Sequence, residues 1–237
     1  MKELFTTEPS AAPAAVLAVC TIDSLLSLGI ADVAQELLPF FEHPHWAVRY
    51  RAAQAASKNP SPLYIQALKK LSSACEIPVR VQSAEALIRS GEKEGRAALA
   101  RSALSDDYVE RSTAVSVLGS LREESAKEIL AEALQKEEDT SLRMEIAAHL
   151  INFTEEMPLA DFETGLSGEN PFIRLQAITL LSRLSALGSH LSASVREILR
   201  KAEATEPDEF LRFQIRRALQ GNLTDSLDSK FQPHLEG

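Results

Sequence analysis

Five arginines recur along the chain at a nearly constant spacing, each directly after an aliphatic residue. The pairs are Val48-Arg49, Val79-Arg80, Leu142-Arg143, Ile173-Arg174 and Leu211-Arg212. A guanidinium group carries a planar fork of donors that matches carboxylates and carbonyl oxygens. Arginines in this pattern have two possible uses: they bind acidic ligands, or they brace one part of the protein against the next.

The spacing favours the bracing role. With Val109 placed in the one gap of the series, the steps between aliphatic positions are 31, 30, 33, 31 and 38 residues. Self-similarity at a period of about 20–50 residues is typical of repeat architectures. We therefore assign Arg49, Arg80, Arg143, Arg174 and Arg212 to a structural ladder. In this alignment Glu110 stands where the other repeats have arginine, which predicts a missing brace and a weak joint.

Each pair begins a helix whose apolar positions recur at three- and four-residue spacings, the period of one helical face. Helix-breaking or capping residues lie between these helices and the ones before them, so the sequence predicts six helical hairpins. The first helices are expected near residues 31–42, 62–74, 94–104, 125–136, 158–167 and 190–203. The second helices are expected near residues 46–58, 78–90, 108–120, 140–152, 171–184 and 209–220.

The predicted fold class is all-α, an α-solenoid of about six hairpins. A helix over residues 14–28, stopped at Gly29, lacks the arginine and is expected to be half a repeat serving as the N-terminal cap. Arg216 breaks the apolar pattern of the sixth repeat and is expected on a solvated end face. We expect one domain over residues 14–221, a flexible leader over 1–13 and a flexible tail over 222–237.

Composition excludes several classes of protein. The net charge is −9, which counts against a nucleic-acid partner. Cys20 and Cys75 form no CxxC pair, and no apolar run is long enough for a membrane span, so we expect a cytoplasmic location. His43 and His45 lack the third ligand of a zinc site. We therefore predict no catalytic residues, no metal and no cofactor.

The repeated unit resembles HEAT repeats of the short, roughly 30-residue form common in bacterial proteins. The resemblance rests on an acidic turn followed by an aliphatic-Arg pair and an Ala-rich helix, as in residues 138–147, and covers about residues 31–221. It implies a right-handed superhelix whose second helices line the inner surface, with the arginine ladder bracing successive repeats. Iron-binding members of the family carry repeated His-Glu pairs, and none of the five histidines here is followed by Glu.

The resemblance implies that side chains three, six and ten residues after the aliphatic position project into an inner groove. The groove residues so assigned are Arg51, Gln54, Lys58, Gln82, Glu85, Arg89, Glu145, Asn152, Gln176, Arg183, Gln214 and Arg217. The six second helices hold twelve basic and four acidic residues, and seven basic against four acidic once the five ladder arginines are set aside, so the groove is mildly basic within an acidic chain. This balance favours a protein or peptide partner with acidic residues.

The predicted function is a non-catalytic scaffold or adaptor that binds a partner protein or peptide on its inner helix surface. One alternative is a nucleic-acid-binding or DNA-repair module of the same fold. The other is a phycobilin-lyase-like or chaperone protein acting on a cofactor-bearing partner. Both alternatives follow from the family resemblance, and neither changes the residues assigned to the groove and the ladder.

Overall fold

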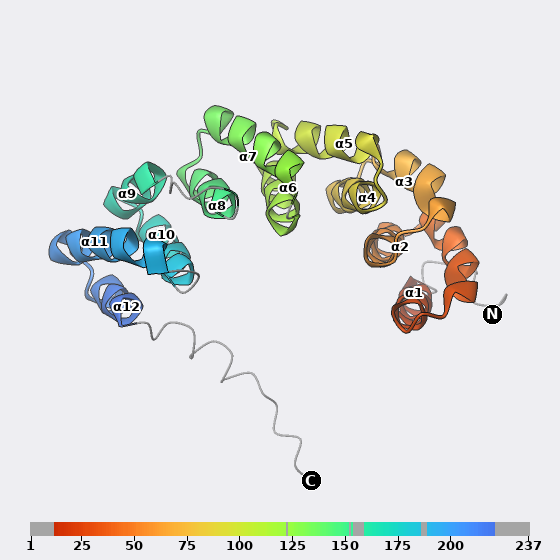
Figure 1. Cartoon of the computed structure of the whole chain (residues 1–237), viewed down its shortest axis with the longest axis horizontal. Coiled ribbons are helices and arrows are strands. Elements are labelled where there is room, and N and C mark those ends of the chain that lie inside the picture. Colours follow the sequence, from red (N-terminus) through yellow and green to blue (C-terminus); the bar gives the residue numbers. More distant parts are fainter. Residues whose placement is uncertain (1–11, 122, 152, 154–158, 186–188, 221–237) are drawn as a thin grey trace, which may run out of the picture. The chain divides into compact units, whose positions relative to one another are not determined.

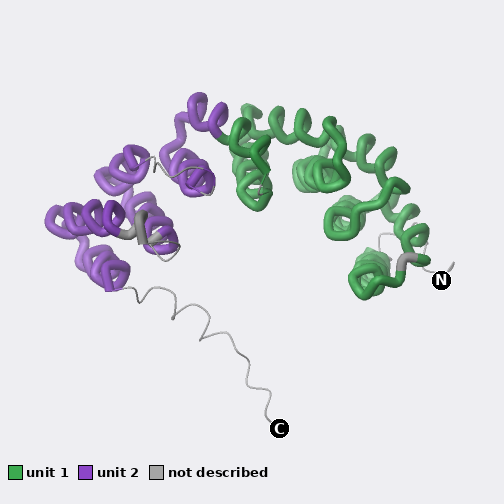
Figure 2. Tube along the Cα trace, viewed as in Figure 1, with its two compact units in different colours: residues 1–130 green, residues 131–237 purple. Residues whose placement is uncertain are grey.

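The computed structural model describes residues 12–121, 123–151, 153, 159–185 and 189–220, and this part of the chain holds helices and turns without a strand. The chain is divided into two compact units, unit 1 with residues 1–130 and unit 2 with residues 131–237 (Figure 2). The boundary falls inside helix α7 (Glu124–Lys136). The expected leader and tail lie almost wholly outside the described residues, and the single domain expected over 14–221 stays a prediction.

Unit 1 consists of two layers of helices (Figure 1). One layer holds α1 (Ala12–Ser27), α2 (Trp46–Lys58), α4 (Ile77–Arg89) and α6 (Tyr108–Ser120), and α2 packs on both α1 and α4. The other holds η3 (Ala31–Glu42), η4 (Pro62–Tyr64), α3 (Ile65–Leu71) and α5 (Lys93–Ala103). Helices α2 and α4 thus each pack against the first helix of their own hairpin and against the helices of their own layer on either side.

Alanine makes this close stacking possible in α2. Ala52, Ala53, Ala55 and Ala56 are all at most 1% exposed, so the helix is buried on more than one side. Large side chains fill the space nearer the first helices, where the Phe41 and Tyr64 rings lie 5.5 Å apart. Burial of this apolar surface at about 25 cal/mol per Å² is the main driving force for stacking the repeats.

The first helices of repeats one and two depart from the α-helices that the periodicity predicts. Residues Ala31–Glu42 form a 3-10 helix with Pro39 inside it, and the second repeat begins with the 3-10 turn Pro62–Tyr64 before α3. Proline has no N–H for an i→i−4 hydrogen bond and its ring crowds the preceding turn. The periodicity therefore predicted the extents of these segments but not their hydrogen-bond pattern.

Two glycines end helices in the left-handed region. Gly29 follows α1 with φ of +83° and Gly91 follows α4 with φ of +81°, where a side chain would be strained. The stop predicted at Gly29 is confirmed.

Unit 2 repeats the two-layer arrangement. Its second helices are α8 (Thr140–Leu150), α10 (Pro171–Ser185) and α12 (Glu209–Leu219), and α10 packs on both of the others. Its first helices are the second part of α7, α9 (Leu159–Ser167) and α11 (Ser189–Thr205). Gly165 on α9 is a point of close approach, because a Cβ there would collide with Sδ of Met144 and lie 3.4 Å from Cβ of Ala177.

Candidate functional site

Four of the ladder arginines, Arg49, Arg80, Arg143 and Arg174, bind carbonyl oxygens of the turn that precedes their own helix. Nη1 of Arg49 donates to the carbonyls of His43 and Pro44, both at 2.7 Å. The same pattern, six and five residues back, recurs for Arg80 at 2.7 and 3.0 Å and for Arg174 at 2.9 and 2.8 Å. Each guanidinium therefore closes the hairpin turn of its own repeat.

The other edge of each guanidinium binds a carboxylate supplied by the following hairpin. These ion pairs are Arg49–Glu76 at 2.7 Å, Arg80–Glu110 at 2.6 Å, Arg143–Asp161 at 2.6 Å and Arg174–Glu206 at 2.9 Å. The Arg80 and Arg174 pairs are bidentate, a strong geometry for charged hydrogen bonds. The guanidinium groups of these four arginines are therefore bonded within the protein, where they link consecutive hairpins of each unit.

The gap expected at Glu110 is wrong. Arg111 makes the turn contacts of a ladder arginine there, since its Nη1 donates to the carbonyls of Ser105 at 2.9 Å and Asp106 at 3.0 Å, six and five residues back. Counted from the arginines, the repeat is in register and Glu110 occupies the aliphatic position. Glu110 is 8% exposed and receives hydrogen bonds from Arg80, Ser102 and Ser105. The hydrogen bond from Arg80, followed by those from the serines, lowers the pKa of Glu110 against the opposing effect of burial.

Arg212 differs from the other ladder arginines. The carboxylate it faces is Glu209 of its own helix, 4.0 Å away and with a side chain 94% exposed. Within the described residues no hairpin follows α12. Among the described residues, Arg212 therefore lacks the carboxylate from a following hairpin that the other four ladder arginines bind.

The residues assigned to the groove in unit 1, here called the unit 1 stripe, are Arg51, Gln54, Lys58, Gln82, Glu85 and Arg89. Arg51, Lys58 and Arg89 are exposed, but Gln82 is buried at 8% exposure. Glu85 binds both Gln82 at 2.6 Å and Arg89 at 2.9 Å. Lys58 pairs with Asp23 of α1 at 2.7 Å. Much of the stripe's charge is therefore balanced within the unit.

Arg51 is the exception among these cations. Its Nη1 donates to Oε1 of Gln54 at 2.7 Å, a neutral amide oxygen, and its guanidinium lies 6.0 Å from the Tyr50 ring centre. An amide is a weaker acceptor for a cation than a carboxylate. Among the cations of the unit 1 stripe, Arg51 is therefore the one where an incoming carboxylate gains most.

The unit 2 stripe comprises Glu145, Gln176, Arg183, Gln214 and Arg217. Gln176 links α8 to α10, because its Nε2 donates to Glu145 at 3.1 Å while its Oε1 accepts from Ser141 at 2.5 Å. Burial raises the pKa of Glu145, opposed by the Gln176 bond, and burial together with Arg183 lowers the pKa of His149. Arg183 is exposed, and Asn152 lies outside the described residues.

Exposed aromatic side chains near the starts of second helices were missed in the sequence. Trp46 in unit 1 is 44% exposed, and in unit 2 Phe172 is 78%, Phe210 58% and Phe213 55% exposed. The available signal was an aromatic residue two or three positions before the ladder arginine, as in Trp46, Phe172 and Phe210. Solvent-exposed aromatic residues of this kind are enriched at protein interfaces.

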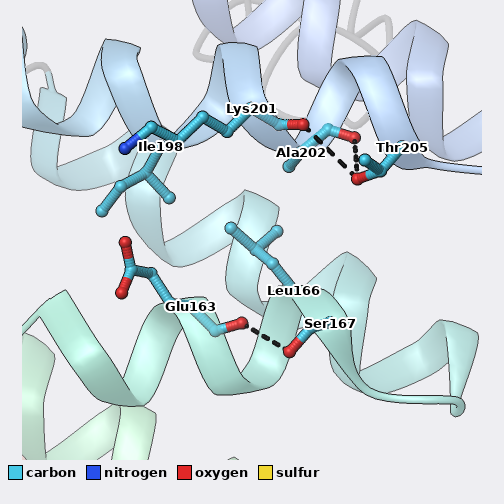
Figure 3. A pocket seen from close by; sticks show the side chains of 7 residues that line it. All are labelled: Glu163, Leu166, Ser167, Ile198, Lys201, Ala202 and Thr205. Carbon is cyan, nitrogen blue, oxygen red and sulfur yellow. Dashed lines mark hydrogen bonds between the residues drawn. The ribbon is translucent and has the colours of Figure 1, made fainter.

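A cleft of about 340 Å³ lies between α9 and α11 in unit 2 (Figure 3). Its hydroxyls are already bonded to helix carbonyls, Ser167 to Glu163 at 2.9 Å and Thr205 to Ala202 at 3.3 Å. Leu166, Ile198 and Ala202 supply apolar surface. The cleft offers an apolar seat with charged edges and no paired nucleophile and base.

The two histidines before α2 serve as caps. Nδ1 of His43 accepts from the His45 amide at 3.1 Å, and Nδ1 of His45 accepts from the Ala47 amide at 3.2 Å. The Trp46 ring stacks beside His45, with 6.3 Å between the ring centres, and Trp46 is 44% exposed. Across the residues that the structure describes, no three His, Cys, Asp or Glu side chains gather as metal ligands. None of the described helices is long and apolar enough to cross a membrane.

The stacked hairpins, the two layers and the arginine braces define a helical-repeat protein of the α-solenoid class. Residues 65–151 match the family model of HEAT repeats, in agreement with the resemblance inferred from the sequence. The chain is also similar to the crystal structure of the archaeal HEAT-like repeats protein from Thermococcus onnurineus NA1. The identity is 14%, the TM-score 0.44, and the match covers 86% of this chain and 92% of the other. No curated protein matches the chain in sequence.

Proposed function

We propose that this chain is a non-catalytic interaction module that binds a partner protein or peptide through its second helices. HEAT repeats commonly serve as interaction scaffolds, which supports the class of function. The braces support the location, because the ladder arginines that looked available for ligands are bonded internally. On the described second helices, exposed cations remain at Arg51, Lys58 and Arg89 in unit 1 and at Arg183 and Arg216 in unit 2.

The proposal rests mainly on the exposure and bonding of Arg51. It is exposed, it stands on a helix whose alanine face is fully buried, and its hydrogen-bond partner is the neutral Gln54. A rigid helix presents this guanidinium at low entropic cost, and a partner carboxylate is a better acceptor than the amide. Arg89, exposed on the next second helix, adds a second cation that shares Glu85 with Gln82. The partner chemistry is therefore an acidic segment lying across α2 and α4.

Affinity capture with the full chain tests this proposal. Arg51→Glu with Arg89→Glu is expected to weaken the captured complex by at least about tenfold, because two favourable charges become repulsive. The control is Arg96→Glu with Arg101→Glu on α5, an equal charge change at exposed positions of a first helix. Arg183→Glu tests unit 2 separately.

Partners are identified by mass spectrometry and then measured individually against each variant. Equal loss in the stripe variant and the α5 control would mean that net charge, not the stripe, governs binding. Retention of every partner by the stripe variant would place the binding surface elsewhere. Circular dichroism of each variant confirms that the helices are intact.

A further inference from the structure

The cleft between α9 and α11 has a floor that continues the core of unit 2. Ile198 is 5% exposed and belongs to that core, while Leu166 and Ala202 are partly buried and pack against it. Figure 3 shows Leu166 and Ile198 extending into the cleft from its two sides. An apolar side chain placed in the cleft would therefore contact the core of unit 2 directly and be removed from water.

The corresponding seam in unit 1 is filled by the chain itself. There Tyr64 of η4 is fully buried, and its hydroxyl donates to the carbonyl of Ala34 on η3 at 3.1 Å. The Tyr64 ring also lies 5.5 Å from that of Phe41. None of the described residues that line the cleft between α9 and α11 is aromatic. This seam therefore lacks the large side chain that closes its counterpart and has room for one from outside.

The cleft is open along its length. A second hollow of about 520 Å³ shares Leu166, Ser167 and Thr205 with it and continues to Pro207. Ser167 and Thr205 are exposed, and their hydroxyls donate to carbonyls of their own helices, which leaves lone pairs to accept from a peptide N–H. Small-molecule sites bury about 70–90% of their ligand, which an open groove does not do. The shape favours a peptide that inserts a side chain and keeps its backbone at the surface.

The charges at one end of the cleft are not balanced. Lys201 pairs with Glu197 of its own helix at 2.9 Å, and among the described residues the Glu163 carboxylate has no ion pair. The hydrogen bond to Glu197 raises the pKa of Lys201, and the charge of Glu163 adds to this effect from the other side of the cleft. Arg196 and Arg200 lie on the opposite face of α11. Two carboxylates and one ammonium group thus face an incoming ligand, which favours a cation.

We propose that the groove between α9 and α11 binds a basic segment of a partner protein, with an apolar side chain seated on Leu166 and Ile198 and a neighbouring Lys or Arg paired with Glu163. This inference does not rest on the proposed function, because it concerns the first helices and a partner segment of the opposite charge. The net charge of −9 on this chain favours a basic partner over a second copy.

Random peptides displayed on phage, selected on the immobilised full chain at about 0.15 M salt, provide the probe. The recovered peptides should be enriched in Lys or Arg next to Leu, Ile or Phe. The strongest of these peptides is then synthesised and its Kd measured by fluorescence anisotropy. Glu163→Lys should weaken its binding by about tenfold or more, because an attraction becomes a repulsion. Replacing the basic residue of the peptide with Glu should restore binding to this variant.

Two matched controls separate the groove from general charge and from bulk. Glu138→Lys makes the same charge change at an exposed position of unit 2 outside the groove and should leave the Kd within about twofold. Thr205→Phe fills the groove from its rim and should weaken binding by about tenfold, whereas Ala204→Phe, on the opposite face of α11, should not. Circular dichroism checks that each variant is folded.

Three results would overturn the proposal. The first is a selection without enrichment of basic and apolar residues. The second is equal loss of binding in Glu163→Lys and Glu138→Lys, which would mean that net charge attracts the peptide. The third is full binding to Thr205→Phe, which would place the apolar contact outside the groove.

Discussion

Replacing Glu110 with arginine should destabilise the protein. From the sequence alone this change would supply a missing brace and strengthen a joint. In the structure Arg111 already bonds the turn carbonyls, and Glu110 is the acceptor for Arg80 at 2.9 Å from Nε and 2.6 Å from Nη2. An arginine at position 110 would face Arg80 and would leave Ser102 and Ser105 without their carboxylate acceptor.

The size of the effect follows from the burial of the pair. The side chains of Arg80 and Glu110 are 22% and 11% exposed, so the pair is largely but not wholly desolvated. Removing one member of a buried pair costs about 3–5 kcal/mol, because the other charge is left without compensation. Arg80 keeps the carbonyls of Ala74 and Cys75, which places Glu110→Gln below that range, at about 1–3 kcal/mol. The like charge in Glu110→Arg places it within the range.

Urea denaturation followed by circular dichroism at pH 7 measures this cost. A loss of about 3 kcal/mol lowers the midpoint by about 1 M or more at the slopes usual for proteins. Glu128→Arg, at an exposed position of α7, is the control and should change stability by no more than about 0.5 kcal/mol. A double-mutant cycle with Arg80→Gln isolates the pair. An arginine at 110 that is as stable as the wild type would refute the assignment of Glu110 as the acceptor.

Three further changes follow from single contacts. Gly165→Ala should cost about 1–3 kcal/mol of unfolding free energy, because the new Cβ meets Met144, whereas Gly168→Ala, with its nearest contact at 3.5 Å, should be nearly neutral. Glu145→Gln should stabilise the protein at pH 7 and less so near pH 4, because burial raises the folded-state pKa and so penalises the charged form; equal effects at both pH values would contradict this. Burial holds the pKa of His149 below 6.5, so the wild type should lose stability as pH falls below 6.5, and His149→Gln should lose less in urea titrations across that window.

The sequence predicted the hairpins well because their signals are local. Caps and prolines mark the turns, and the observed second helices begin and end within about two residues of their predicted limits, as in Trp46–Lys58 and Tyr108–Ser120. The register error at Val109 has a physical origin. An aliphatic residue one position early matched the hydrophobic pattern, but one residue turns a helix by about 100°, and only the arginine must reach the turn carbonyls. Aligning the arginines would have identified Arg111.

The exposure of the stripe side chains could not be predicted from such local signals. Gln82 has the repeat position of exposed Arg51, yet it is buried at 8% exposure and bonded to Glu85. Its exposure depends on how closely the neighbouring helices approach. That distance is decided by residues far away in sequence, such as Gly95, which lets α5 come within van der Waals contact of α4. Periodicity assigns a residue to a face but does not say how much of that face a neighbour covers.

The two-sided bonding of the ladder arginines couples the conformation of a turn to the presence of the next hairpin. Nη1 of Arg174 holds the turn carbonyls of Gly168 and Glu169, while Nε and Nη2 hold Glu206 before the next second helix. A guanidinium that lost Glu206 would retain half its partners and leave a charge 11% exposed with reduced compensation. Each brace therefore makes a folded hairpin more stable when the following one is folded, which is the nearest-neighbour coupling expected of repeat proteins. In this chain the coupling is electrostatic as well as apolar, so within unit 1 it should weaken in acid as Glu76 and Glu110 protonate. For Glu110 and Glu76 the folded-state pKa lies below 4.5, and their stabilisation is lost as pH falls from about 4.5 through those lowered values.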